Sequence, residues 1–134
     1  VLVGIHLRDN GKLPSGEKII NIFKKYKNKN WIGIIMACIS PGAYELVIND
    51  LQKLDIPYGF KLNAFKKIPE GYTVASKDQW GNAGNPITVL GKNTDLNESK
   101  FYEYAKKFMK NGATILGGCC EIRPSHIKEI AKLK

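Results

Sequence analysis

Three cysteines, Cys38, Cys119 and Cys120, are the residues of this sequence best suited to chemistry. A thiolate is both a nucleophile and a soft metal ligand, and Zn²⁺ favours sulfur in a tetrahedral shell. Three protein ligands leave one position open, which is typical of a catalytic zinc site. A thiol substrate bound at that position has its pKa lowered by the metal. The three cysteines therefore predict a zinc site that accepts a thiol.

Cysteine also occurs in proteins as a small buried hydrophobic residue, and Cys38 taken alone fits that role. The Cys119-Cys120 pair fits it poorly, because it follows Gly117-Gly118 directly. We expect the two glycines to let the backbone turn sharply, so that both thiols face one ion. An odd number of cysteines without a signal peptide is typical of a reducing cytoplasm, and a disulfide between adjacent residues is strained.

Strands and helices alternate along the chain, as judged from apolar periodicity and helix-start signals. Ser40 followed by Pro41 is typical of a helix start, and Ser15 is a further candidate cap. Residues 64–94 show no clear period, so we expect a long loop there, with a short strand at 87–90. The predicted strands are 1–7, 31–38, 58–63 and 113–116, and the predicted helices are 15–27, 40–54, 97–110 and 125–134.

The four strand–helix units define an α/β fold. The units average roughly 33 residues, which fits an eight-unit barrel of about 250 residues. The chain is therefore either a small open sheet or half of a (β/α)8 barrel. In both architectures the active site lies at the carboxyl ends of the strands, where all three cysteines fall.

The segment from Gly117 to Ile127 reads Gly-Gly-Cys-Cys-Glu-Ile-Arg-Pro-Ser-His-Ile. It resembles the Gly-Gly-Cys-Cys-x-x-x-Pro-x-His-Ile signature of homocysteine S-methyltransferases, a family of (β/α)8 TIM-type barrels that includes betaine-homocysteine methyltransferases. The segment from Gly33 to Val47 resembles the family's earlier strand, which ends in one zinc-binding cysteine and runs into Ser/Thr-Pro and a helix. Matched residue by residue, the resemblance makes Cys38, Cys119 and Cys120 the ligands of Zn²⁺.

The resemblance covers nearly the whole chain and implies that residues 1–134 are the last four βα units, the C-terminal half of a homocysteine-binding barrel. It implies methyl transfer from a sulfonium or betaine-type donor to the thiolate of homocysteine, giving methionine. The family's acidic residues that hold the homocysteine ammonium come from N-terminal strands, which this sequence does not contain. We therefore expect the isolated chain to be inactive without its N-terminal half. Ala37, Leu62 and Glu121 stand where many members have Asn, Pro and Gly.

Three further residues near the predicted strand ends are candidates for substrate binding: Asn63, Gly118 and His6. Asn63 ends the third strand, where its amide can hydrogen-bond substrate or orient a metal ligand. His6 ends the first strand, where it either approaches the substrate pocket or, as we favour, has a structural role.

Four other side chains have alternative roles. His126 follows a helix-opening proline and is expected to make local polar contacts, because imidazole would close the position that the substrate needs. Glu121 and Asp9 are the acidic residues near strand ends, and both are weak candidates for the substrate ammonium. Trp80, in the long loop, either closes over a methyl donor or anchors the loop.

The chain is basic, with 21 Lys and Arg against 12 Asp and Glu among its 134 residues and a net charge of +9. The lysines recur singly or in pairs at positions typical of solvated helix faces, so we predict no nucleic-acid partner. No apolar run approaches the roughly 18 residues of a membrane span, and no signal segment precedes the first strand. We expect a cytoplasmic protein without a membrane partner.

Three hypotheses stay open. The first is the methyltransferase described above, with homocysteine and a small-molecule methyl donor as its ligands. The second is a non-catalytic zinc-binding half-barrel that needs an N-terminal partner fragment, and the third is a basic binding module with incidental cysteines. The start at Val1 without Met suggests a piece of a longer chain. A half-barrel has two exposed strand edges, so association into homo-oligomers is expected.

Overall fold

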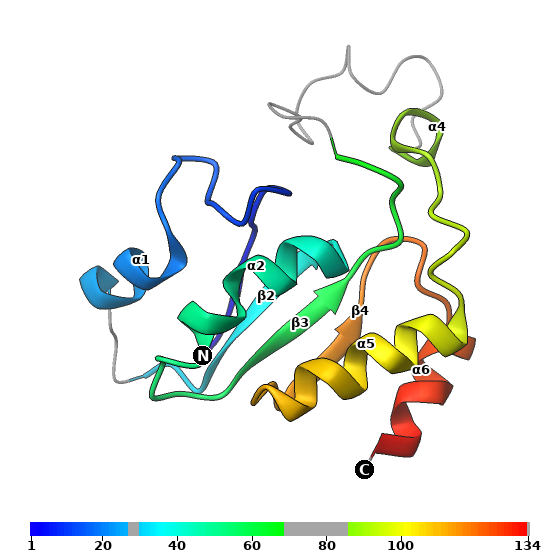
Figure 1. Ribbon diagram of the computed structural model, residues 1–134. Helices are drawn as coiled ribbons and strands as arrows, with labels where there is room; N and C mark the ends of the chain where they lie inside the picture. The colour runs from blue at the N-terminus through cyan, green and yellow to red at the C-terminus, as the bar shows by residue number, and fades with distance from the viewer. Residues whose placement is uncertain (27–29, 69–85, 134) are drawn as a thin grey trace.

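Four parallel strands form the centre of the computed structural model, which describes residues 1–26, 30–68 and 86–133 (Figure 1). They pair in chain order, β1-β2-β3-β4, without the reversal of order that a doubly wound sheet has at its switch point. The predicted α/β class is therefore confirmed, and the topology is consistent with part of a TIM-type barrel. The strands are β1 (Leu2–Ile5), β2 (Gly33–Ile39), β3 (Tyr58–Leu62) and β4 (Ile115–Gly118).

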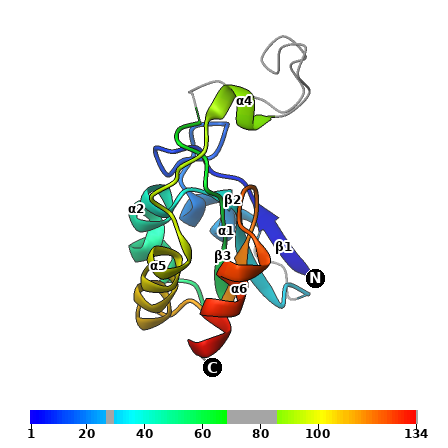
Figure 2. The same ribbon diagram turned by 90° about the vertical axis from the view of Figure 1, so that its right-hand side faces the viewer.

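The helices follow the strands in the order that the sequence predicts. The N-cap of α2 is Ser40, whose hydroxyl oxygen accepts from the Ala43 N–H at 3.2 Å, and Asn97 caps α5 in the same way. Figure 2 shows α2 and α5 on the same side of the sheet. The described helices are α1 (Ile19–Tyr26), α2 (Pro41–Leu51), α4 (Pro86–Leu90), α5 (Glu98–Lys110) and α6 (Pro124–Ile130), and α6 continues into a 3₁₀ turn, Ala131–Leu133.

The hydrophobic core lies between the sheet and these helices. Its centre is an aromatic cluster of Tyr44, Phe60 and Phe108, whose ring centroids lie 4.5 to 5.5 Å apart and which come from α2, β3 and α5. Burial of such a side chain contributes about 1.5–3 kcal/mol. Successive side chains of a strand point to opposite faces of the sheet. The strand residues between those in the core therefore point to the face that these helices do not cover.

The other face of the sheet, called the open face below, carries small and more exposed residues. Gly59 pairs there with Ile115, and a Cβ on Gly59 would collide with the Ile115 carbonyl, so only glycine allows β3 and β4 to lie this close. Leu2 at the end of the face is 45% exposed. By strand register, the open face consists of Leu2, Gly4, Gly33, Ile35, Ala37, Gly59, Lys61, Ile115 and Gly117.

Two sequence predictions were wrong in detail. The first helix starts at Ile19, not after Ser15, whose hydroxyl instead donates to the Glu17 carboxylate at 2.9 Å. The predicted strand at 87–90 is the helix α4, which Pro86 opens and in which the Gly91 N–H bonds to the Ile87 carbonyl at 2.9 Å. The β-branched residues suggested a strand, but proline at a first helical position outweighed them.

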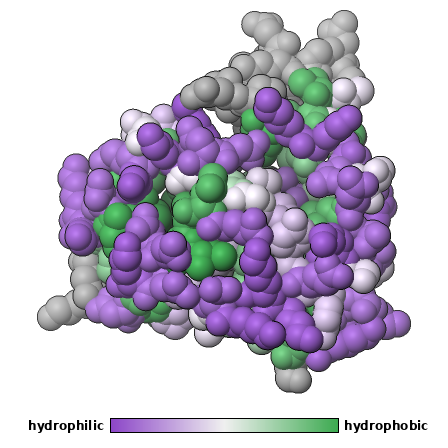
Figure 3. Space-filling view, viewed as in Figure 1, coloured by the Kyte–Doolittle hydropathy of each residue, from purple (hydrophilic) through white to green (hydrophobic). Residues whose placement is uncertain are grey.

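The helix-covered surface is largely hydrophilic, with apolar residues in scattered areas (Figure 3). Lysines dominate it as predicted, and Lys107 of α5 pairs with Glu45 of α2 at 2.6 Å. Among the described helices, none has the length and apolar character needed to cross a membrane.

Candidate metal centre

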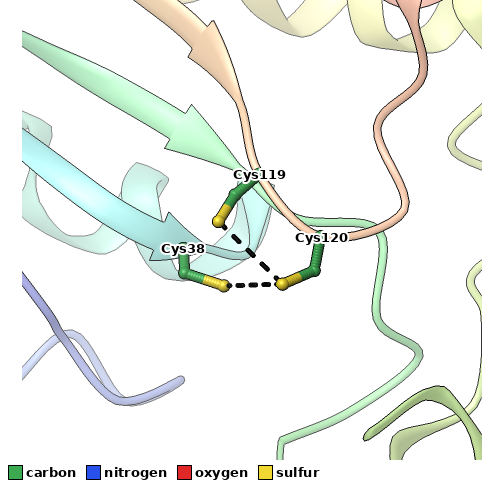
Figure 4. A group of neighbouring side chains, drawn as sticks. All are labelled: Cys38, Cys119 and Cys120. Carbon is green, nitrogen blue, oxygen red and sulfur yellow. Dashed lines mark hydrogen bonds between the residues drawn. The ribbon is translucent and has the colours of Figure 1, made fainter. Parts of the chain in front are cut away.

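The three cysteine sulfurs converge at the carboxyl end of the sheet (Figure 4). The Sγ atom of Cys38 lies 3.6 Å from that of Cys120, and the Sγ atoms of Cys119 and Cys120 are 4.0 Å apart. All three sulfurs lie within 4.8 Å of one another, and each thiol is free and partly exposed. Residues far apart in the sequence thus meet at one point, as parallel strands with a common carboxyl edge predict.

The spacing of the sulfurs fits a zinc ion. Zinc–sulfur bonds of about 2.3 Å in a tetrahedral shell place two sulfurs about 3.8 Å apart. Two of the sulfur pairs, at 3.6 and 4.0 Å, bracket that value. Soft sulfur donors also select zinc over magnesium or calcium. Three sulfurs in this arrangement provide three corners of a tetrahedron.

The thiol of Cys38 is positioned by a bulge in β2. The pairing of β2 with β3 shifts between Ala37 and Ile39, so Cys38 is the extra residue, with φ of 53°. This left-handed conformation costs a residue with a side chain about 1–2 kcal/mol. Bulges redirect a side chain at the end of a strand, and here the redirected thiol meets the sulfur of Cys120.

The cysteine pair is held by the end of β3 on the neighbouring strand. The Cys119 N–H donates to the Leu62 carbonyl at 2.7 Å, and the Cys120 carbonyl accepts from the Ala64 N–H at 3.0 Å. These two bonds extend the β3–β4 pairing beyond the last strand residue. The pair therefore has a fixed backbone before any metal binds.

The double glycine does not make the turn that we expected of it. Gly117 and Gly118 are regular residues of β4, and neither has a positive φ. Glycine is needed at 118 for space, because a Cβ there would lie 2.7 Å from the Cβ of Ile122. The left-handed residue of this loop is instead Glu121, with φ of 62°, at a position where the resemblance describes glycine in many members.

Asn63 holds the first cysteine in place. It is 1% exposed, its amide nitrogen donates to the Cys38 carbonyl at 2.7 Å, and it lies 3.9 Å from the Cys38 sulfur. Its amide oxygen accepts from the Phe65 N–H at 3.1 Å. Of the two roles that the sequence left open, this geometry favours orienting a metal ligand. Substrate binding by Asn63, Gly118 and His6 stays a prediction.

The sulfurs perturb one another's ionisation. Hydrogen bonds from Cys38 and Cys120 lower the pKa of the Cys119 thiol, as does the positive charge of Lys61. The hydrogen bond to Cys119 and burial together raise the pKa of Cys38, and burial raises the pKa of Cys120. The metal-free cluster therefore favours one thiolate stabilised by two thiols, and a metal ion must displace the two remaining protons.

Neither histidine belongs to the sulfur cluster, and the two differ in burial. The ring of His126 is buried, with Nδ1 accepting from the Arg123 N–H at 3.2 Å and Nε2 lying 3.1 Å from the Leu96 carbonyl. Both nitrogens are engaged, which agrees with the predicted local role. His6 is exposed, and its Nδ1 is 3.4 Å from the Ala37 carbonyl, close to the residue before Cys38.

The two acidic candidates both have partners. One Asp9 oxygen accepts from the Ser40 hydroxyl at 2.9 Å and the other from the Ile68 N–H at 3.1 Å, so this carboxylate joins three loops. The Glu121 carboxylate lies 3.9 Å from the Lys92 ammonium. The Asp9–Ser40 link was not predictable from the sequence, because it joins residues from different strand–helix units.

Two further residues are Trp80, which the sequence analysis named, and Lys61, which it did not. Trp80, singled out in the long loop, lies outside the described residues. Lys61, which sequence reasoning passed over, is an exposed residue of β3 whose charge reaches Cys119. A lysine inside an otherwise apolar strand was the available signal for it.

Comparison with known proteins assigns the chain to a family. The family model described as homocysteine S-methyltransferase matches residues 1–133, and the chain belongs to that family. It is 28% identical over 135 aligned residues to a relative named Homocysteine S-methyltransferase 1 from Saccharomyces cerevisiae. That alignment covers 96% of this chain and 37% of the relative, so the chain spans well under half of the relative's length.

Proposed function

We propose that this chain is the C-terminal half of a (β/α)8 barrel that transfers a methyl group from a sulfonium or betaine-type donor to homocysteine, giving methionine. Family membership supports the reaction and the acceptor. The sulfur cluster, which meets the spacing of a zinc site, is the single observation that supports the metal-dependent form of the reaction. Three free thiols in one site also favour the cytoplasm as the compartment.

The residues of the chain have separate tasks in this proposal. Cys38, Cys119 and Cys120 hold Zn²⁺, which when bound acts as a Lewis acid for the homocysteine sulfur and keeps it as a thiolate at neutral pH. Asn63 keeps the Cys38 loop in the ligand conformation through its bond to the Cys38 carbonyl. The bonds of Cys119 and Cys120 to the end of β3 preorganise the other two ligands.

The second candidate is a zinc-binding half-barrel that has no activity until an N-terminal partner fragment joins it. For the isolated chain, this candidate is favoured by the two carboxylates near the strand ends, because both already have partners. Asp9 and Glu121 both interact with other groups of the chain, which leaves neither of them for the substrate ammonium.

The test measures methionine formed from homocysteine and S-methylmethionine by the zinc-loaded chain, with and without an N-terminal half-barrel of a family member supplied in trans. The proposal predicts methionine when both halves are present and none with Cys119→Ser. Zinc binding without methionine in the combined sample would support the non-catalytic candidate. A chain that binds no zinc would contradict both.

A further inference from the structure

Lys61 lies on the open face beside the sulfur cluster. Its register partners are Ala37 of β2 on one side and Gly117 of β4 on the other. A Cβ built on Gly117 would lie 3.5 Å from the Cγ of Lys61, so the lysine stem lies over the backbone of this glycine. A row of small residues thus gives the lysine its space.

The same register brings the lysine next to the metal centre. Residues two apart in a strand share a face, so Gly117 and Cys119 both lie on the side of the sheet that carries Lys61. The continued pairing from Leu62 to Cys119, at 2.7 Å, keeps this geometry up to the cysteine.

The ammonium of Lys61 is available to a ligand. The residue is exposed, and among the described residues none forms an ion pair with it. The two carboxylates that the sequence offered near the strand ends have other partners, Asp9 with Ser40 and Ile68, and Glu121 with Lys92. The side chain therefore supplies an unpaired positive charge next to the position where the proposed thiol substrate binds.

We propose that Lys61 binds the carboxylate of the thiol substrate and so makes the site selective for thiols that carry an acid group. This inference rests on the proposed function, because it takes homocysteine as the thiol. An ammonium–carboxylate hydrogen bond is among the stronger polar contacts in proteins. Lys61 thereby recognises the anionic end of the amino acid, while the thiol end is held at the sulfur cluster.

The test is a binding titration on the full chain loaded with Co²⁺, whose absorption spectrum changes when a thiol joins its ligand shell. Two thiols are compared: homocysteine, and 3-aminopropane-1-thiol, which has the same chain without the carboxylate. The variants are Lys61→Met, Lys61→Arg and, as a matched loss of one charge, Lys110→Met on the exposed side of α5. Cobalt stoichiometry and thermal unfolding verify that each variant is folded.

We expect Lys61→Met to weaken homocysteine binding roughly tenfold, as the loss of a charged hydrogen bond predicts, with under about twofold change for the aminothiol. Lys61→Arg should keep most of the affinity, and Lys110→Met should behave as the wild type. Equal weakening for both thiols would overturn the inference, because Lys61 would then act on the sulfurs and not on the carboxylate. No change for either thiol would also overturn it. A wild-type chain that binds cobalt but no thiol would instead contradict the proposed function itself.

Discussion

The helix-covered face of the sheet and its carboxyl end are built on opposite principles. Beneath α2 and α5, Tyr44, Phe60 and Phe108 are fully buried, in close ring contact and in regular helices and strands. At the carboxyl end, Cys38 and Glu121 have left-handed backbones, and the thiols are partly exposed. Strain of this kind persists only where the surroundings determine the conformation. The comparison indicates that the aromatic core maintains a geometry which the metal centre could not maintain alone.

The largest expected effect is on the metal. Cys119→Ser removes one of three sulfur ligands, and we expect zinc affinity to fall by at least about 1,000-fold, since apparent binding free energies of structural zinc are roughly 10–16 kcal/mol. Competition with a chromogenic chelator measures it. Unfolding of the metal-free variant should be unchanged, and a substantial loss of its stability would contradict the separation of site from core.

The second substitution is in the hydrophobic core and is expected to change stability. Phe108 is fully buried between Tyr44, Phe60 and Tyr104, and Phe108→Ala should lower the free energy of unfolding by about 3–5 kcal/mol. Urea denaturation of the metal-free chain measures the change. Met109→Ala, on the exposed side of the same helix, is the control and should change stability by under about 0.5 kcal/mol. Comparable losses for both variants would mean that this core does not support the sheet.

Zinc affinity should depend steeply on pH. The pKa values of Cys38 and Cys120 are raised in the metal-free chain, so both thiols are protonated at neutral pH and zinc must displace their protons. Affinity should then rise by about 100-fold per pH unit through neutrality, because metal binding releases about two protons. Titrations at several pH values test this, and an affinity independent of pH would mean that the ligands are already thiolates.

A smaller effect is expected from the residue that orients Cys38. Asn63→Ala removes the 2.7 Å bond to the Cys38 carbonyl, and we expect zinc affinity to fall by about 10- to 100-fold, as for other residues that support metal ligands. Asn63→Asp keeps the shape of the side chain but removes the N–H donor. It therefore tests the hydrogen bond to Cys38 separately from the packing of the side chain. If Asn63→Ala bound zinc as tightly as the wild type, the bulge alone would be sufficient to hold Cys38.

The smallest effect is a gain of stability. Glycine adopts the φ of 62° found at Glu121 without strain, so Glu121→Gly should raise the free energy of unfolding by about 1 kcal/mol. Thermal unfolding of the metal-free chain measures it, with Glu129→Gly in the helix α6 as a control of opposite sign. A loss of stability would show that the contacts of the Glu121 carboxylate outweigh the backbone strain.

The sequence predicted the parts of this centre that follow from topology. Cys38, Cys119 and Cys120 each end or follow an apolar run, and parallel strands bring such positions to one edge. The cap at Ser40 was equally predictable, since it depends on two adjacent residues.

Features that depend on neighbouring strands were not predictable. The bulge at Cys38 is a shift of register against β3, and the need for Gly118 comes from contact with Ile122. The helix at 86–90 was mistaken for a strand because its β-branched residues outweighed the proline in our prediction. The positive φ of Glu121 has no signal in its residue type, although the resemblance placed glycine there.

X-ray absorption of the zinc-loaded chain tests the central claim most directly, because it counts the sulfurs around the metal. We predict one zinc per chain with three sulfur neighbours at about 2.3 Å and a fourth, lighter neighbour, which a fourth sulfur replaces when homocysteine is added. Two or fewer sulfurs per zinc, or a shell unchanged by homocysteine, would contradict the account.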